Sequence, residues 1–154
     1  MNLLSAKFKL ALDEFILKVD IEIPVHGFTV LFGPSGSGKT SFLRCISGLE
    51  RAPEGFLQIG DETWQDERKG LFIPTNERKI GYVFQEMRLF PHLNVEGNLR
   101  YGLKRRAPQN GNVLFSQIVE IMGLETFLSR YPRNLSGGEK QRVALARALL
   151  TRPR

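Results

Sequence analysis

Apolar and polar positions alternate loosely along residues 3–23, with the period of β-strands. Apolar side chains take every second position around Phe8 and again around Val19. The alternation breaks between these runs, at the polar pair Asp13 and Glu14. The pattern therefore predicts two strands joined near that pair.

Three shorter apolar runs predict further strands. Residues 28–32, Phe-Thr-Val-Leu-Phe, are rich in strand-forming residues and bounded by glycines, which predicts a buried strand of a parallel sheet. Residues 56–59 and 80–84 predict two more strands. The polar stretch 61–79 between them predicts a loop.

Helical spacing replaces the strand pattern from Thr40 onward. Apolar positions three and four residues apart predict helices from Thr40 to the region of Gly48, over 95–104, over 113–122, around 125–130 and over 137–150. Gly48 and Gly123 stand where the first and third helices would end. Strands with one crossover helix, followed by a helical block and a last helix, predict an α/β protein.

Composition and charge narrow the possible partners. The chain has 154 residues, which predicts one domain, and no apolar run approaches the roughly 18 residues that cross a bilayer. Its single cysteine, Cys45, excludes an internal disulfide and suits a reducing compartment. The net charge of +6 lies in residues 128–154, where seven Lys and Arg accompany one acid, Glu139. Because no aromatic residue interleaves with these charges past Tyr131, we expect a polyphosphate or an acidic partner surface and no nucleic acid.

The sequence GPSGSGKT, residues 33–40, matches the phosphate-binding pattern G-x-x-x-x-G-K-[ST]. Glycines let successive backbone N–H groups point inward, and the following helix N-terminus adds partial positive charge. The pattern predicts that Lys39 reaches the β- and γ-phosphates of a nucleotide and that the Thr40 hydroxyl holds Mg²⁺. The alternative is a glycine-rich turn that only caps a helix. The predicted nucleotide contacts here are Gly33, Pro34, Ser35, Gly36, Ser37, Gly38, Lys39, Thr40 and Ser41.

A second glycine-lined helix start lies in LSGGEKQR, residues 135–142. Ser136 and Glu139 have the spacing of a capping box, so Ser136 as a simple helix cap is one interpretation. Gly137 and Gly138 in the first helical turn each cost roughly 1 kcal/mol relative to alanine. A close approach of backbone N–H groups to a phosphate is the other interpretation. Two such helix starts in one chain predict either two nucleotides or two copies that share nucleotides.

The motifs together resemble those of the ABC ATPases and stand in that family's order. GPSGSGKT resembles the Walker A motif, LSGGEKQR resembles the signature motif, and Gln85 in IGYVFQE resembles the Q-loop glutamine. The resemblance implies a P-loop NTPase fold with an antiparallel N-terminal β part and a helical subdomain, with ATP and Mg²⁺ as cofactors. It divides the chain into the β part with the phosphate loop (1–85), the helical subdomain (86–135) and the signature helix (136–154).

The resemblance also implies a homodimer in which the phosphate loop of each copy faces the signature motif of the other across one ATP. Ser136, Gly137, Gly138, Glu139 and Gln141 would then complete the nucleotide contacts. Gln85 would contact Mg²⁺ and the attacking water. An aromatic residue that stacks on adenine is expected upstream of the phosphate loop. Phe15 is a candidate, with a place in the strand core as the alternative.

The spacing between motifs resembles that of importers. Gln85 and Ser136 are 51 residues apart, which leaves room for a compact helical subdomain but for no long coiled coil. Residues 86–103 look like the segment that receives a coupling helix from the membrane permease, and residues 78–102 look like the ATP-binding subunit of molybdate importers. The resemblance implies a peripheral subunit on the cytoplasmic face of the plasma (inner) membrane, with a periplasmic binding protein as an indirect partner. The alternatives are a fragment that binds nucleotide and permease without turnover and a non-transport ABC protein.

The sequence departs from the family pattern at its end. The family continues into an aliphatic strand ending in Asp-Glu and a later histidine, and no aliphatic run followed by Asp-Glu occurs in the 154 residues. We therefore expect these residues to be part of a longer ATPase and to bind ATP without measurable hydrolysis. We also expect an incomplete core sheet that leaves residues 28–32 uncovered, and a marginal fold. Trp64 and Cys45 are expected to be packing residues, and His26 and His92 surface residues.

Overall fold

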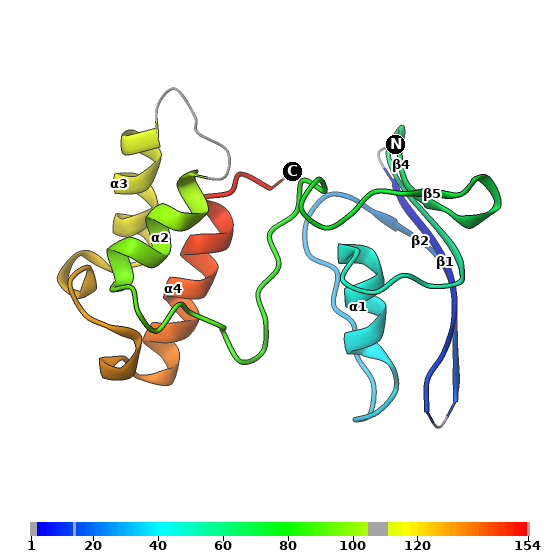
Figure 1. Cartoon of the computed structure of the whole chain (residues 1–154), viewed down its shortest axis with the longest axis horizontal. Coiled ribbons are helices and arrows are strands. Elements are labelled where there is room, and N and C mark those ends of the chain that lie inside the picture. Colours follow the sequence, from blue (N-terminus) through cyan, green and yellow to red (C-terminus); the bar gives the residue numbers. More distant parts are fainter. Residues whose placement is uncertain (1–2, 14, 105–110, 154) are drawn as a thin grey trace. The chain divides into compact units, whose positions relative to one another are not determined.

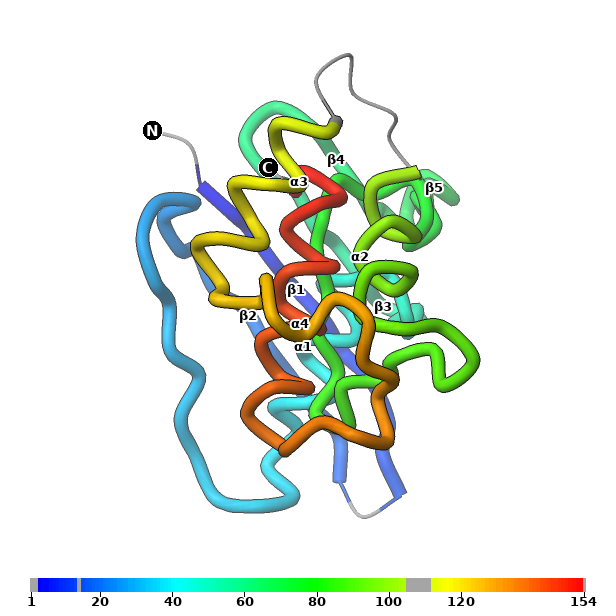
Figure 2. The backbone as a smooth tube through the Cα atoms, turned by 90° about the vertical axis from the view of Figure 1, so that its left-hand side faces the viewer, coloured from blue at the N-terminus to red at the C-terminus, as the bar shows by residue number. Residues whose placement is uncertain are grey.

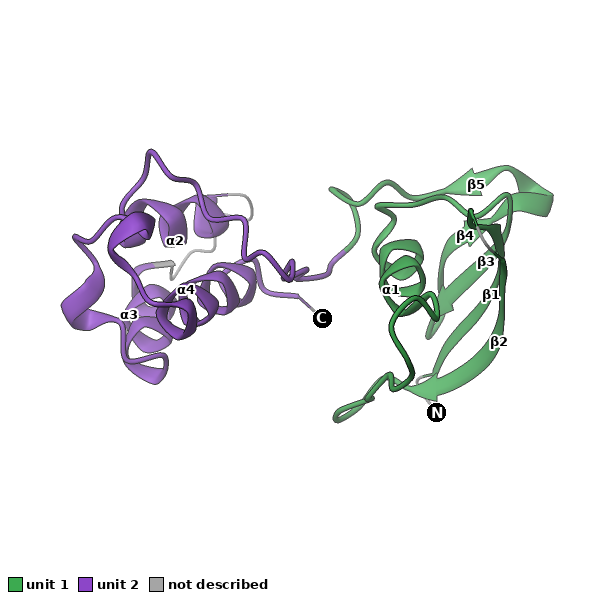
Figure 3. Cartoon of the chain, turned by 90° about the horizontal axis from the view of Figure 1, so that it is seen from below, with its two compact units in different colours: residues 1–78 green, residues 79–154 purple. Residues whose placement is uncertain are grey.

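The computed structural model describes residues 3–13, 15–104 and 111–153, and the chain divides into two compact units, 1–78 and 79–154 (Figure 3). The first unit contains β1 (Leu3–Ala11), β2 (Ile16–Pro24), α1 (Lys39–Ser47), β3 (Glu54–Ile59), β4 (Glu62–Asp66), the 3-10 turn η1 (Glu67–Lys69) and β5 (Leu71–Phe72). The second contains α2 (Val95–Lys104), α3 (Gly111–Ile121), η2 (Glu125–Phe127), η3 (Pro132–Asn134) and α4 (Gly137–Leu149).

The first unit is an antiparallel sheet with α1 against one face (Figure 1). Its strand order is β2-β1-β3-β4-β5, and Phe8 on β1 stands opposite Val19 on β2 and Gly55 on β3. The alternation predicted for β1 and β2 is confirmed, although Glu14 in their connection lies outside the described residues. Phe8 meets Phe42 of α1 edge to face, with ring centroids 6.1 Å apart. This pairing places the phosphate-loop helix on the apolar side of the sheet.

Two predicted strands do not form. Residues 28–32 and 80–84 have no strand structure, and Figure 2 follows the first of them as an extended path that joins no sheet. Phe28 is 102% exposed and Phe32 is 95% exposed. A strand depends on hydrogen bonds from neighbouring strands, and no described residue pairs with either segment. The prediction of an incomplete core sheet is therefore confirmed, while the two strand assignments are wrong for the described chain.

The loop predicted over 61–79 is also wrong, because this stretch contains β4, η1 and β5. The signal for the β3–β4 hairpin is the pair Gly60 and Asp61, a two-residue connection of the glycine-first kind that favours tight hairpins. Gly60 has a φ of 58°, which few other residues adopt at low cost. Trp64 is 3% exposed, so its predicted packing role is confirmed, but it lies on the strand β4 and not in a loop.

The second unit closes a core among its helices. The predicted helix 95–104 is confirmed as α2, and the predicted helices 113–122 and 137–150 correspond to α3 and α4. A carbon added at Gly102 of α2 would collide with the carbonyl oxygen of Arg147 on α4, so these helices approach each other closely at a glycine. The buried core residues are Val95, Leu99, Phe115, Val119, Leu124, Leu135, Val143, Ala146 and Leu150. The signature helix thus shares one core with α2 and α3.

Candidate nucleotide-binding site

The phosphate loop runs directly into α1, which begins at Lys39. Gly36 and Gly38 have φ values of 80° and 85°, a backbone conformation that favours glycine. The Gly38 carbonyl accepts a hydrogen bond of 2.8 Å from the Phe42 N–H and so starts the helix. The loop is largely open to solvent, since Pro34, Ser35, Gly36 and Ser37 are exposed. The hydrogen bond that starts the helix joins residues close in sequence, so the helix forms although the strand predicted before it does not.

The Lys39 ammonium lies over the phosphate loop. Its Nζ donates to the carbonyls of Gly33 and Pro34 at 2.9 and 2.5 Å and to the Ser37 Oγ at 3.3 Å. Among the described residues no carboxylate forms an ion pair with Lys39. Within the described ranges this positive charge is therefore held by neutral acceptors and balanced by no carboxylate.

Two other predicted contacts flank the loop. Thr40 is exposed and Ser41 is half-buried on the first turn of α1. Phe15 is 38% exposed rather than part of the strand core, and its ring lies 3.3 Å from where a side chain on Gly38 would begin. An exposed aromatic ring beside the phosphate loop remains the candidate for stacking on adenine.

Arg78, which the sequence analysis did not single out, holds the other end of α1. It is 2% exposed, and its guanidinium donates to the carbonyls of Cys45 at 3.0 Å and Ile46 at 2.6 Å and to that of Ile73 at 2.7 Å. A cation at a helix C-terminus satisfies carbonyls that have no partner within the helix and complements the helix dipole. Burial lowers the pKa of Arg78 to about 10, so the guanidinium stays charged at neutral pH. The helix that carries Lys39 is therefore fixed at its far end by a buried charge.

Two aromatic rings and a glycine lie around the Arg78 guanidinium. The guanidinium lies 5.6 Å from the ring centroid of Trp64 and 5.1 Å from that of Phe72. A carbon added at Gly48 would lie 2.6 Å from the Arg78 Cζ, and Gly48 ends α1 in the left-handed conformation, with a φ of 74°.

Cys45 is fully buried, as predicted, and burial raises the pKa of its thiol to about 11.

The signature motif begins α4 with a complete capping box. The Ser136 Oγ accepts from the Glu139 N–H at 3.3 Å, and the Glu139 carboxylate accepts from the Ser136 N–H at 2.6 Å. Hydrogen bonds from the Ser136 backbone N–H and side chain to the carboxylate lower the pKa of Glu139 below its ordinary value. The capping interpretation is thus confirmed. It leaves the two glycines unexplained, because a carbon added at Gly137 or Gly138 would meet no atom within 4 Å.

Gln85 lies in an exposed turn closed by a 2.9 Å hydrogen bond from the Met87 N–H to the Phe84 carbonyl. It belongs to the second unit, as do Ser136 and the exposed Gln141, whereas Lys39 belongs to the first. The predicted site residues therefore form two groups, one in each unit.

Three further predictions concern metal ligands, the two histidines and membrane-spanning helices. Among the described residues no three His, Cys, Asp or Glu side chains could hold a metal ion together. The prediction that Thr40 and Gln85 contact Mg²⁺ stays a prediction. His26 and His92 are exposed, as predicted. Within the described ranges, no helix combines the length and the apolarity needed to cross a bilayer.

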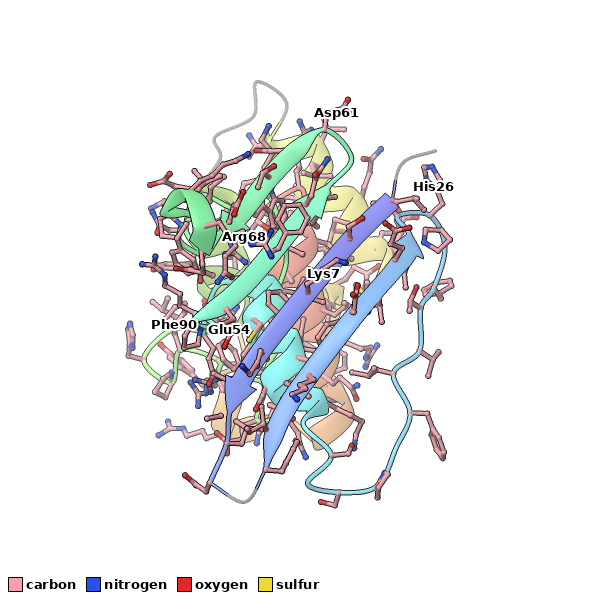
Figure 4. All side chains as sticks on the ribbon, turned by 90° about the vertical axis from the view of Figure 1, so that its right-hand side faces the viewer. Lys7, His26, Glu54, Asp61, Arg68 and Phe90 are labelled. Atoms are coloured by element: carbon pink, nitrogen blue, oxygen red, sulfur yellow. The ribbon has the colours of Figure 1, made fainter. Side chains whose placement is uncertain are left out.

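A hollow of about 910 Å³ lies on the sheet face that carries Lys7 and Glu54 (Figure 4). Two of its lysines pair with carboxylates of the same lining, Lys7 with Asp20 at 3.0 Å and Lys9 with Glu54 at 2.6 Å. No residue of the phosphate loop lines it. We therefore assign it no part in nucleotide binding.

The family model described as "ABC transporter" matches residues 16–154. The chain belongs to the ABC transporter family. Among curated ABC proteins, it is 50% identical over 151 residues to the molybdenum import ATP-binding protein ModC of Pseudomonas savastanoi pv. phaseolicola, covering 98% of this chain and 42% of that protein. It is 52% identical over 151 residues to ModC 1 of Azotobacter vinelandii, with the same coverage of both chains. The chain thus spans about two fifths of the length of these relatives.

Solved ABC cassettes share the fold. The dimeric structure of MJ0796, a bacterial ABC transporter cassette, matches with a TM-score of 0.74 and 29% identity, over 99% of this chain and 71% of that one. A post-hydrolysis dimer of MJ0796 bound to ADP and Pi matches with a TM-score of 0.73 and 30% identity, over the same shares. The predicted fold, an ABC ATPase with an antiparallel β part and helices, is therefore confirmed.

Proposed function

We propose that this chain is the nucleotide-binding part of the ATP-binding subunit of an ABC importer, and that two copies close head to tail around ATP. The observation that carries the proposal is the open space over Gly137 and Gly138, where an added carbon would meet no atom within 4 Å. Glycine in a helix costs roughly 1 kcal/mol relative to alanine, and packing within the described chain does not account for either residue. A phosphate held by a second copy accounts for both.

The phosphate loop fits a triphosphate on two grounds. The Lys39 ammonium has no carboxylate partner among the described residues, and a carbon added at Gly36 would meet nothing within 4 Å. Lys39 and the loop amides would hold the β- and γ-phosphates, with Phe15 beside the base. Bound Mg²⁺ would supply positive charge to the phosphates, and Thr40 and Gln85 would hold it.

The signature group would complete the site from the other copy. The Ser136 hydroxyl and the amides of Gly137 and Gly138 would contact the γ-phosphate, with Glu139 and Gln141 at the edge of the same surface. The capping box keeps this helix start formed in the single chain, so its amides would be ordered before the phosphate arrives. The dimeric MJ0796 cassettes support pairing between two copies.

The names of the relatives support an oxyanion, molybdate, as the cargo of the whole importer. Residues 86–103 would bind the permease at the cytoplasmic face of the inner membrane, and a periplasmic protein would select the cargo. ATP binding and hydrolysis by the full-length subunit would drive uptake. The same names favour import over a non-transport role in translation or DNA repair.

Titration with a fluorescent ATP analogue in Mg²⁺ tests the first half of the proposal. We expect Lys39→Ala to weaken binding roughly tenfold or more, because a charge-assisted contact to phosphate is lost. Lys79→Ala, at an exposed position in the second unit, is the matched control and should bind like the parent chain. Equal affinity of the parent chain and Lys39→Ala would exclude the phosphate loop as the binding site.

Gly137→Ala tests the second half. The added methyl group meets nothing in the chain, so unfolding should be unchanged or slightly harder. ATP-dependent pairing with itself or with a full-length relative, measured by analytical ultracentrifugation, should be lost. Leu145→Ala, an exposed site on the same helix, is the control and should pair normally. Pairing that ignores ATP or survives Gly137→Ala would overturn the shared-nucleotide arrangement.

Binding to membranes tests the transport assignment. Vesicles that contain a molybdate permease should retain the chain, and vesicles with an unrelated permease should not. Retention on ribosomes or DNA in place of the permease would favour the non-transport alternative.

A further inference from the structure

A single arginine connects the signature helix to the loop that follows Gln85. Arg147 lies on α4, and its Nη2 donates to the carbonyls of Met87 at 3.2 Å and Arg88 at 3.0 Å. The Met87 N–H closes the turn around Gln85. The backbone of Met87 therefore makes both contacts: its N–H closes the turn, and its carbonyl accepts from Arg147 of the signature helix.

The backbone at this contact is strained. Met87 has a φ of 57° and Arg88 a φ of 41°, a left-handed conformation that non-glycine residues seldom adopt. The Arg88 N–H also donates to the Glu86 carbonyl at 2.6 Å, which makes the turn very tight. Such conformations persist only where the surroundings hold them. Arg147 donates to both strained residues, so it is the side chain placed to hold them.

The rest of the loop is held by α2. Asn98 is fully buried, accepts from the Phe90 N–H at 2.8 Å and donates to the carbonyls of Phe90 and Leu93, both at 3.1 Å. The Arg147 guanidinium lies 5.1 Å from the Phe90 ring centroid, and its Nη1 reaches the Asn98 Oδ1 at 3.4 Å. Side chains from α2 and α4 thus hold the same loop. Of the two, Asn98 binds its later part, and Arg147 also binds the residues next to Gln85.

We infer that Arg147 is a positioning residue for Gln85, because it holds the Gln85 turn to the helix whose N-terminus carries Ser136. The inference rests on the proposed function, which assigns Gln85 and that N-terminus to ATP. It adds a connection between two parts of the proposed site, since a displacement of α4 on nucleotide binding would also displace the Gln85 turn through Arg147. The planar guanidinium fork serves two carbonyls and a ring face at once, which a lysine ammonium does not.

Hydrogen–deuterium exchange of the nucleotide-free chain decides the inference. In Arg147→Met, the amides of Met87 and Arg88 should exchange roughly tenfold faster, because hydrogen bonds from a charged donor are lost. Amides in the middle of α2 and α4 should keep their rates, a separation that general loss of packing would not produce. Arg147→Lys should give an intermediate rate at the same two amides.

Arg142→Met is the matched control. Arg142 also lies on α4 and donates to two carbonyls, those of Met122 at 2.9 Å and Gly123 at 3.2 Å, but these end α3. This variant should speed exchange at the end of α3 and leave Met87 and Arg88 unchanged. Unchanged exchange at Met87 and Arg88 in Arg147→Met, or equal acceleration there in Arg142→Met, would overturn the inference. If Arg147→Met unfolds the second unit as a whole, Arg147→Lys decides in its place by the same criterion.

The same measurement with Mg-ATP and a full-length relative separates this inference from the proposed function. Protection of residues 136–140 by ATP in the parent chain supports the function, and its absence counts against the function alone. Where that protection is seen, exchange at Met87 should also respond to ATP in the parent chain but not in Arg147→Met. An equal response in both chains would show that Gln85 is positioned without Arg147.

Discussion

The two units contain 78 and 76 residues, and each has buried core residues, but the first also leaves an apolar segment, residues 28–32, exposed. In the first unit, Phe28, Val30 and Phe32 are 84% to 102% exposed. In the second, Leu99 and Val143 are fully buried among three helices. Both units contain apolar segments. They differ in the kind of element that each apolar segment is suited to form.

Hydrogen bonding explains the contrast. A helix satisfies its backbone groups within itself, so α2, α3 and α4 need only one another's apolar faces. A strand such as the one predicted at 28–32 satisfies its backbone groups only through neighbours. The helices of an α/β protein therefore form from local signals, while an inner strand depends on partners that are distant in sequence.

The largest expected effect is on the free energy of unfolding, when one large apolar side chain in each unit is replaced by alanine. Leu99→Ala should lower the free energy of unfolding of the second unit by about 2–5 kcal/mol, because a fully buried side chain leaves a cavity. Phe32→Ala should change the stability of the first unit by no more than about 0.5 kcal/mol, since the ring is 95% exposed. Urea unfolding followed by circular dichroism measures both. A large loss from Phe32→Ala would show that residues 28–32 are packed in solution and would break the comparison.

The next effect tests whether α1 is held firmly in the first unit although residues 28–32 are exposed. Arg78→Met should destabilise this unit by about 2–3 kcal/mol, because two carbonyls at the end of α1 lose a buried charged donor. Cys45 reports the loss, since burial raises its pKa to about 11 and keeps the thiol unreactive. Alkylation by iodoacetamide at pH 8 should therefore be slow in the parent chain and clearly faster in the variant.

Arg44→Met is the control for that measurement. Arg44 is on the same helix, but it is partly exposed and pairs with Glu50 at 3.1 Å. Alkylation of Cys45 should stay slow in this variant. Fast alkylation in the parent chain would mean that α1 is not held by Arg78 at all.

Local signals predicted much of the structure and of the site. The 3.6-residue period placed α2 correctly, the alternation placed β1 and β2, and the pattern S-x-x-E predicted the capping box of Ser136. The phosphate loop was likewise predicted from contiguous residues. In the helix, the capping box and the phosphate loop the interacting groups lie within a few residues of one another, and the alternation of β1 and β2 is visible within each strand by itself.

Contacts between distant residues were not predictable in this way. Arg78 donates to a carbonyl 33 residues away, and Arg147 donates to one 60 residues away. The acceptors are backbone carbonyls, which every residue has, so no particular partner residue marks the pair. The missing strands at 28–32 and 80–84 have the same origin, because strand pairing is also a distant backbone contact.

The smallest expected effect concerns how firmly the second unit holds the start of its last helix. The hydrogen bonds from Ser136 lower the pKa of Glu139, so the ionised carboxylate is favoured in the folded chain. Its contribution to stability is complete above the unfolded pKa, near 4.5, and is lost as the pH falls through the lowered folded value. Amides at the start of α4 should therefore lose exchange protection in acid, after correction for the intrinsic pH dependence of exchange. Glu139→Gln should lack this pH dependence. An equal pH dependence in the glutamine variant would assign it to another group and would leave the cap of α4 dependent on Ser136 alone.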